Sequence, residues 1–394
     1  MTKPRLHWSV FAALCVASGA YAHPEDSVRL KLEYGITHDS NHFRVANDAQ
    51  ALALLGSTDT SVTTSRTGAG VDADLRIGRQ LVMLRGMFYN VDFDRVQLKP
   101  TTELRVLADW NWVAGNRLSG SLNYRVQQEL QSQADVSTAE QSKQEQTVAG
   151  FSASYQVHPS FYLDLGLSEA TYVYSPTARK VLDRNERSHS LGWRFPTRAG
   201  NYLGMQYRKT EGDYPNQLPA RTYEQTEYKL NGTWAPTGVS SLAWAVGQSR
   251  RADGPITLSQ PTWSLSGTWA PAGKTSFNAG WAHSVGSSES ATVSTTTVTD
   301  DTALGATWRA TAKLSLKGTV RGQNVQYGEA GRTDRIRGGG IALEYQPLRS
   351  VQATLSYDSE RRDSSVSAAE YRYEKWSAAL RATCLHATDA QALP

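Results

Sequence analysis

The chain has 394 residues, of which 39% are hydrophobic and 20% are charged, and its formal net charge is +4 at neutral pH. A mean hydropathy of −0.48 excludes a helical membrane protein, because such a protein needs long apolar runs. A charge this close to neutral provides no clustered basic footprint, so nucleic acid is not an expected partner.

A secretory signal is predicted at residues 1–22. Lys3 and Arg5 form its basic end, an apolar core follows, and Ala22 ends a small-residue cleavage site. The apolar core is shorter than the run of about 20 apolar residues that a spanning helix needs. We therefore expect cleavage after Ala22 and delivery of residues 23–394 to the cell envelope.

Apolar and polar residues alternate along much of the mature chain. In residues 103–112 one face is apolar and ends in Trp110 and Trp112, whereas the other face carries Arg105 and Asp109. Side chains change face at every residue of a strand, so the pattern predicts strands with one face towards lipid and one towards a polar interior. The same alternation returns in residues 117–126, 313–321 and 351–358.

Tight turns follow aromatic residues at regular intervals. Trp234-Ala235-Pro236 has a near copy in Trp269-Ala270-Pro271, and each copy ends one alternating stretch before the next begins. The unit recurs every 35 to 44 residues, roughly the length of two membrane strands and one outer loop. Turns on the periplasmic side are predicted near residues 77, 114, 158, 198, 237, 272, 311 and 347.

Adding a first strand near residues 27–36 and a last strand near 371–385 gives about 18 strands, with a range of about 16 to 18. The predicted fold class is all-β: a transmembrane, antiparallel, up-and-down β-barrel in the bacterial outer membrane. A soluble β-sandwich would need two apolar inner faces, but here one face of each strand is polar.

Polar segments between the predicted strands indicate external loops. Residues 127–146, 211–221 and 288–299 are rich in small polar side chains and have no periodicity. The first long loop, 37–63, is different because it contains a small apolar run at 49–55. Two alternatives stay open for it: a segment folded into the pore, or a surface loop with a helical turn.

No catalytic or metal site is predicted. His38 and His42 have the spacing of metal ligands on a helix, but no helix is predicted around them. His189 and Ser190 are adjacent, so in a strand they point to opposite faces and cannot act together as a hydrolase pair. Gly338-Gly339-Gly340 lies in an alternating stretch without a following helix, which argues against a phosphate loop. We expect no enzymatic activity and no cofactor.

The polar strand faces supply the candidate lining of a pore. Their charges are mixed in sign with a basic excess, which in a narrow pore favours anionic solutes. Alternatively, the charges pair across strands and keep the interior rigid. The predicted pore-lining residues are Arg105, Asp109, Arg125, Lys229, Arg309, Lys313, Lys317 and Arg321.

About a quarter of the chain resembles the EpsL-type outer-membrane barrels of exosortase-associated exopolysaccharide operons. The resemblance rests on Asp39-Ser40-Asn41-His42-Phe43-Arg44, Gly78-Arg79-Gln80, Tyr89-Asn90 with Phe93, Asp109-Trp110-Asn111-Trp112, Gly115, Arg117-Leu118-Ser119-Gly120 and Leu122-Asn123-Tyr124. It implies a role in passing secreted polysaccharide through the outer membrane, and it marks Asp39, Asn41, Phe43 and Arg44 as a family-motif loop. The carboxyl end departs from this family, because barrels of this kind usually finish on an aromatic residue and this chain ends in a polar tail.

These observations leave three functional hypotheses. The first is an export conduit for an extracellular polysaccharide, working with periplasmic partners. The second is a diffusion porin for small, anionic solutes, with outer-membrane lipids as its surroundings. The third, an outer-membrane hydrolase, predicts activity that is lost when His189 or Ser190 is substituted.

Overall fold

The computed structural model describes residues 28–134, 140–175, 177–197, 200–254, 256–288, 296–328 and 331–386. The signal and cleavage site predicted at 1–22 lie outside these ranges, as does nearly all of the polar tail. In the described ranges the chain forms one 18-stranded antiparallel sheet. Pairing of the first strand with the last closes the sheet into a barrel, which confirms the predicted fold class.

The strands of the first half are β1 (Val28–Asp39), β2 (Val62–Ile77), β3 (Gln80–Phe93), β4 (Thr101–Ala114), β5 (Leu118–Leu130), β6 (Lys143–His158), β7 (Phe161–Ser175), β8 (Arg184–Pro196) and β9 (Tyr202–Tyr214). Those of the second half are β10 (Arg221–Thr237), β11 (Ser240–Asp253), β12 (Ile256–Ala272), β13 (Thr275–Ser287), β14 (Thr296–Arg309), β15 (Leu314–Tyr327), β16 (Thr333–Leu348), β17 (Val351–Ser364) and β18 (Tyr371–His386). The helices are α2 (Asp48–Leu55), η1 (Thr177–Leu182) and η2 (Ser367–Ala369).

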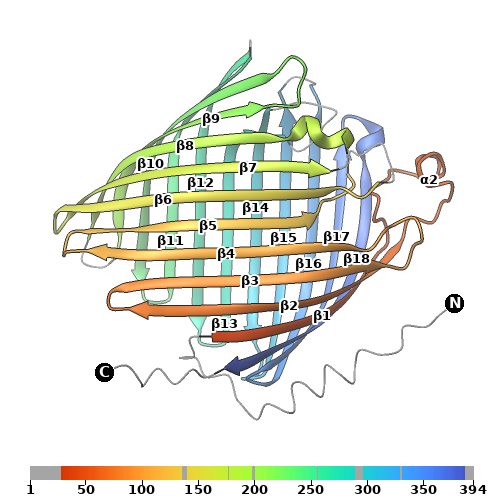
Figure 1. Cartoon of the computed structure of the whole chain (residues 1–394), viewed down its shortest axis with the longest axis horizontal. Helices are drawn as coiled ribbons and strands as arrows, with labels where there is room; N and C mark the ends of the chain where they lie inside the picture. Colours follow the sequence, from red (N-terminus) through yellow and green to blue (C-terminus); the bar gives the residue numbers. More distant parts are fainter. Residues whose placement is uncertain are drawn as a thin grey trace.

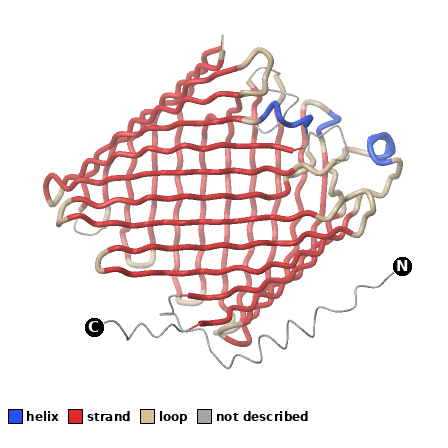
Figure 2. The backbone as a smooth tube through the Cα atoms, in the orientation of Figure 1, coloured by secondary structure: helices blue, strands red, loops and turns tan. Residues whose placement is uncertain are grey.

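Each strand pairs with its neighbours in chain order, so the topology is up-and-down. In Figure 1, β1–β9 cross in front of β10–β18 at a steep angle, and the tube trace of Figure 2 shows the same lattice. Such crossing of the near and far walls is expected, because strands must tilt by about 40° to close a barrel.

The two ends of the barrel differ. At one end, which we call the tight-turn end, the strands are joined by short turns at seven of the eight positions predicted from the sequence, and the eighth, near residue 198, lies outside the described ranges. Gly78 and Gly115 adopt φ of 60° and 61° in two of these turns, a conformation that favours glycine. Val28 and His386, the ends of β1 and β18, also meet here. The opposite end, the long-loop end, carries α2 beyond the strands (Figure 1).

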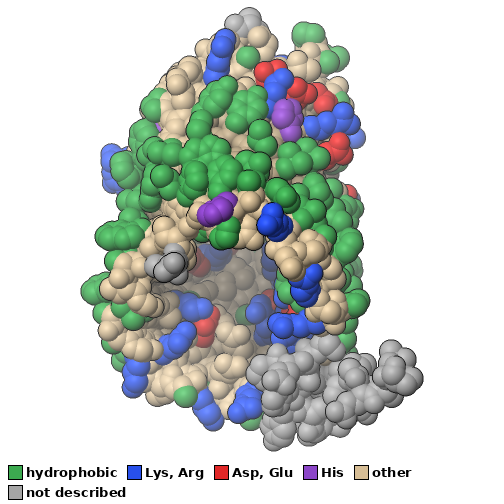
Figure 3. Space-filling view, turned by 90° about the vertical axis from the view of Figure 1, so that its left-hand side faces the viewer, with side chains coloured by type: hydrophobic (Ala, Val, Ile, Leu, Met, Phe, Trp, Pro, Cys, Tyr) green, Lys and Arg blue, Asp and Glu red, His purple; other side chains and the backbone are tan. Residues whose placement is uncertain are grey.

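The outward strand face is apolar and uncovered. Trp110, Trp234, Trp269 and Trp308 lie near the tight turns and are each at least 43% exposed. Figure 3, viewed towards the tight turns of the first strands, shows apolar side chains on the outer wall around a hollow interior. An aqueous solvent would penalise so much exposed apolar surface, whereas a lipid bilayer accommodates it. None of the helices in the described ranges has the length and apolar character that a membrane-spanning helix needs.

The first loop, between β1 and β2, contains the only apolar core cluster found among the described residues. Phe43, Val45 and Ala51 pack there with Val62 and with Leu98 from the next long loop. Asn47 caps α2 by accepting a hydrogen bond from the Gln50 backbone nitrogen at 3.0 Å, and Gly56 ends it with φ of 68°. The small apolar run at 49–55 is therefore this helix, packed at the long-loop end.

Candidate functional site

The hollow interior is the candidate functional site. Figure 3 shows basic and acidic side chains on the inner wall of the opening at the tight-turn end. Strand alternation explains this distribution, because the polar residues of each strand face away from the apolar exterior. The fold thus forms a water-compatible lumen lined by fixed charges.

Seven of the eight predicted lining residues lie in strands, on the face opposite the apolar exterior: Arg105, Asp109, Arg125, Lys229, Arg309, Lys317 and Arg321. Lys313 does not, because β15 begins only at Leu314. The Thr311 hydroxyl accepts hydrogen bonds from the backbone nitrogens of Lys313 and Leu314 at 3.1 and 3.0 Å, which holds residue 313 in the turn. The alternation that included Lys313 in a strand was one residue too long at this end.

On β1–β3 the lumen charges form ion pairs across strands. Asp72 contacts Lys31 of β1 and lies 3.9 Å from Arg85 of β3. Asp74 bridges the same two strands, 2.5 Å from Arg29 and 3.2 Å from Arg85. Three cations share two carboxylates here, so ion pairs cross-link this part of the wall and offset most of its charge, as the rigid-interior alternative expected.

An arginine and tyrosine cluster continues this wall towards the long-loop end. The Arg66 guanidinium lies 3.6 Å above the Tyr89 ring and 2.5 Å from the Glu103 carboxylate. Arg105, one of the predicted lining residues, pairs with Glu129 at 3.2 Å. Stacking on an aromatic ring and pairing with a carboxylate both fix the planar guanidinium in place.

The lumen face of β15–β18 has a similar arrangement. Arg321 lies 2.6 Å from Glu360 and donates a 3.3 Å hydrogen bond to the Tyr373 hydroxyl oxygen. Tyr371 donates to Glu360 at 2.9 Å. Lys317, the second predicted residue on β15, pairs with a glutamate of β16 at 2.6 Å. Both cations therefore have carboxylate partners.

Two mid-barrel arginines have no ion pair within the described ranges. Arg125 of β5 and Arg208 of β9 are exposed and point into the lumen. Glu227, which lies opposite Arg208 in the register, instead pairs with Lys229 of its own strand at 3.0 Å. Arg125 lies opposite Leu107, an apolar neighbour. These two guanidinium groups are free to meet a solute.

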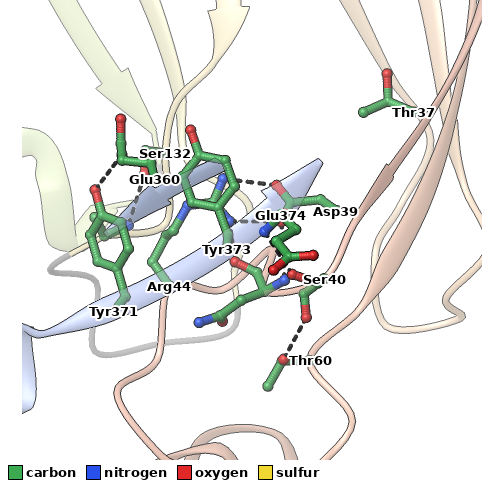
Figure 4. Close-up of polar contacts among 12 residues, drawn as sticks. Thr37, Asp39, Ser40, Arg44, Thr60, Ser132, Glu360, Tyr371, Tyr373 and Glu374 are labelled. Atoms are coloured by element: carbon green, nitrogen blue, oxygen red, sulfur yellow. Dashed lines mark hydrogen bonds and ion pairs between the residues drawn. The ribbon is translucent and has the colours of Figure 1, made fainter. Parts of the chain in front are cut away.

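The family-motif loop fastens the long-loop end of β1 to β18, as the close-up in Figure 4 shows. Arg44 donates to both carboxylate oxygens of Asp39 at 2.9 and 2.8 Å, and its guanidinium lies 3.7 Å above the Tyr373 ring. Arg44 has φ of 55°, a left-handed conformation that these contacts hold.

Asn41 and Phe43 complete the motif. The Asn41 amide accepts from the Val45 nitrogen at 3.1 Å and donates to the Val45 and Arg372 carbonyls at 2.8 and 3.0 Å. Phe43, 2% exposed, anchors the loop core. The four motif residues thus have structural contacts at the join between the first and last strands.

Some lining residues were not anticipated from the sequence. Tyr371 and Tyr373 of β18 turn inward beside Glu360, and Arg251 of β11 is buried over the Tyr223 ring at 3.7 Å. The available signal was weak: aromatic side chains at alternate positions of otherwise polar faces. Only the register shows which arginine stacks on which ring.

The residues considered for catalysis and metal binding do not assemble into such a site. His189 and Ser190 are consecutive in β8, so they lie on opposite faces. His38 lies 3.2 Å from the Thr63 hydroxyl, and His42 packs edge-on against Phe43 and Phe93. Across the described ranges, no three His, Cys, Asp or Glu side chains are placed to hold a metal ion.

Comparisons with known proteins agree with this barrel. The family model described as Putative beta-barrel porin 2 matches residues 255–384, which is less than half of the chain. No curated protein matches the sequence.

Two solved structures of OccK2 (OpdF) from Pseudomonas aeruginosa, one free and one in complex with glucuronate, have the same overall fold. Each is 12% identical to this chain, with a TM-score of 0.51, and the match covers 93% of this chain and 100% of that protein. At this identity the likeness concerns the fold alone. The chain is therefore a closed, 18-stranded antiparallel barrel with the fold of OccK2.

Proposed function

We propose that this protein is an outer-membrane diffusion channel for small anionic solutes. The observation that carries the proposal is the pair of exposed lumen arginines, Arg125 and Arg208, which make no ion pair within the described ranges. Fixed positive charge in a confined pore raises the local concentration of anions and lowers that of cations.

The ion-paired charges of the lumen wall are not the source of the selectivity. The ion pairs on β1–β3 offset most of the charge there, so their main contribution is to the shape of the lumen. Multiple weak contacts with Arg125 and Arg208 would let a carboxylate pass without being trapped. The glucuronate complex of the similar barrel OccK2 supports a small sugar acid as a first test solute.

Export of an extracellular polysaccharide, which the EpsL-type resemblance implied, is the weaker hypothesis. The matched family model is described as a porin, and the similar barrel was solved with a single small acid. Deleting the gene separates the two hypotheses. We expect impaired uptake of small anions with unchanged exported polysaccharide, and the reverse result would favour export.

Liposome swelling tests the proposal on the purified protein. Vesicles containing the barrel should swell faster in glucuronate than in a neutral sugar of similar size. In the R125Q/R208Q variant this preference should fall by about threefold to tenfold, because each exposed arginine contributes an interaction of about 0.3 to 0.7 kcal/mol. K209Q, which changes a cation on the outer wall of β9, is the control and should behave like the wild type. An unchanged preference in R125Q/R208Q would contradict the proposal.

A further inference from the structure

Three arginines form a row across the outer face of adjacent strands near the long-loop end. Arg337 of β16 lies directly opposite Arg361 of β17, which lies directly opposite Arg372 of β18. The side chains of Arg361 and Arg372 are each 70% exposed. Like charges placed directly opposite each other in a sheet repel, so this row is unfavourable without a compensating anion.

The carboxylates around the row do not balance it. Asp363 lies 2.7 Å from Arg361, and Glu374 lies 3.1 Å from Arg372. Arg335, opposite Asp363, brings the number of outward guanidinium groups to four against two carboxylates, a net charge of +2. Within the described ranges neither Arg335 nor Arg337 has an ion-pair partner.

The outer face of β7–β10 near the same end is arranged differently. Arg187 pairs with Glu169 at 3.0 Å, and Lys209 lies between Glu211 and Glu224 at 2.8 and 2.9 Å. Three carboxylates stand there against two cations, so both cations are paired and the group has no positive excess. The arginine row is thus a local feature of β16–β18, not a property of the whole rim.

An apolar groove lies on the same strands, nearer to the tight-turn end. Its volume is about 410 Å³, and its lining includes the small side chains of Ala353 and Ala378. Between groove and row, the rings of Tyr357 and Trp376 meet at 4.4 Å, and Trp376 is 53% exposed. The groove walls include Ile36, Leu343, Leu355 and Leu380.

The spacing of these features matches one lipid molecule. Leu355 of the groove and Arg361 of the row are six residues apart on β17, which corresponds to about 20 Å along a strand. Because the strand is tilted, the height difference is about 15 Å, close to half the thickness of a bilayer's hydrocarbon core. A head group at the arginine row would therefore place an acyl chain at the groove.

We propose that β16–β18 bind a phosphate-bearing lipid of the surrounding leaflet, with its phosphate on Arg337, Arg361 and Arg372 and an acyl chain in the groove. Guanidinium groups bind phosphate oxygens through paired, charge-assisted hydrogen bonds, which a row of three can provide. Binding relieves the repulsion between the arginines and so joins three strands next to the β18–β1 closure. The site lies on the outer wall and is independent of the solute that the lumen carries.

Native mass spectrometry of the delipidated barrel in detergent, titrated with diphosphoryl lipid A, tests the proposal. The wild type should form a one-to-one lipid adduct, and R337Q/R361Q/R372Q should weaken it by about tenfold or more. The matched control R187Q/K209Q/R250Q removes three cations from the outer wall of β8, β9 and β11 and should bind as the wild type does. Heat-modifiable migration in gels verifies that each variant remains a folded barrel.

Two further arms separate a lipid site from a simple anion site. A353F/A378F fills the groove while leaving the arginines, and it should weaken the lipid adduct but not binding of inorganic phosphate. A dephosphorylated form of the same lipid should bind about tenfold more weakly to the wild type. Equal lipid binding by R337Q/R361Q/R372Q and the wild type, or displacement of the lipid by inorganic phosphate with no effect of A353F/A378F, would overturn the proposal.

Discussion

The two sides of the lumen use the same residue types in different ways. On β1–β3, Asp72 lies between Lys31 and Arg85, so ion pairs connect three adjacent strands. On β5 and β9, Arg125 and Arg208 face the lumen without an ion pair within the described ranges. An arginine in a pore wall can therefore be part of the scaffold or part of the selectivity. The availability of a neighbouring carboxylate decides which, since Glu227, opposite Arg208, pairs with Lys229 instead.

Removing a carboxylate from the paired side should have the largest effect on stability. D72N leaves Lys31 and Arg85 facing each other with one partner fewer, and the Asp72 side chain is only 8% exposed. We expect the free energy of unfolding to fall by about 2 kcal/mol, discounted for the partial exposure of both cations. Urea unfolding in lipid vesicles measures it. E169Q, which breaks the exposed outer-wall pair with Arg187, is the control and should change the stability by less than about 0.5 kcal/mol.

Loosening the family-motif loop between β1 and β2 should have the next largest effect on stability. N41A removes hydrogen bonds to Val45 and to the Arg372 carbonyl of β18. We expect a loss of about 1 to 2 kcal/mol and faster amide exchange in residues 40–61, since partly buried polar groups lose their partners. S57A, on the exposed side of the same loop, serves as the control. Equal exchange in N41A and S57A would mean that the motif does not fasten the loop.

Acid should loosen the same loop by a smaller amount. Burial lowers the pKa of His42 below its ordinary value of 6.5, with Asp39 opposing the shift. The folded loop therefore binds a proton less readily than the opened loop, so its stability is full above about pH 6.5 and decreases as the pH falls below that value. Hydrogen exchange of residues 40–61, corrected for intrinsic rates, should show acid-induced opening. H42Q, which does not titrate, should remove the pH dependence.

The smallest effect on stability is expected from substitutions of the two unpaired arginines on β5 and β9. R125Q/R208Q removes two positive charges from the lumen wall. It breaks no ion pair among the described residues. We expect the free energy of unfolding to change by less than about 0.5 kcal/mol. A loss comparable to that of D72N in the same urea experiment would show that these arginines also belong to the scaffold.

The barrel could be predicted from the sequence because lipid imposes a strict pattern on the outward face. Aromatic residues before the tight turns and alternation within the strands located nearly every hairpin. In β3 the alternation is less regular, because the charged Arg85 shares a strand face with Met83 and Met87. The ion pairs of Arg85 with Asp72 and Asp74 explain this charge. The same pattern placed Lys313 in a strand, where the hydrogen bonds of Thr311 form a turn.

The long-loop end was harder to predict. The strands β5 and β6 continue to Leu130 and from Lys143, inside a segment expected to be loop. Above the lipid both strand faces are polar, so periodicity gives no signal there. The ion pairs could not be predicted either, because a single sequence does not reveal which residues lie opposite each other on neighbouring strands. Arg321 and Arg125 look alike in sequence, yet among the described residues Arg321 has a carboxylate partner and Arg125 has none.

The reversal potential of single channels in a planar bilayer under a potassium chloride gradient tests the central claim most directly. An anion-selective lumen predicts a potential with the sign of chloride selectivity in the wild type, reduced towards zero in R125Q/R208Q and unchanged in K209Q. A wild-type potential with the sign of potassium selectivity would contradict the account.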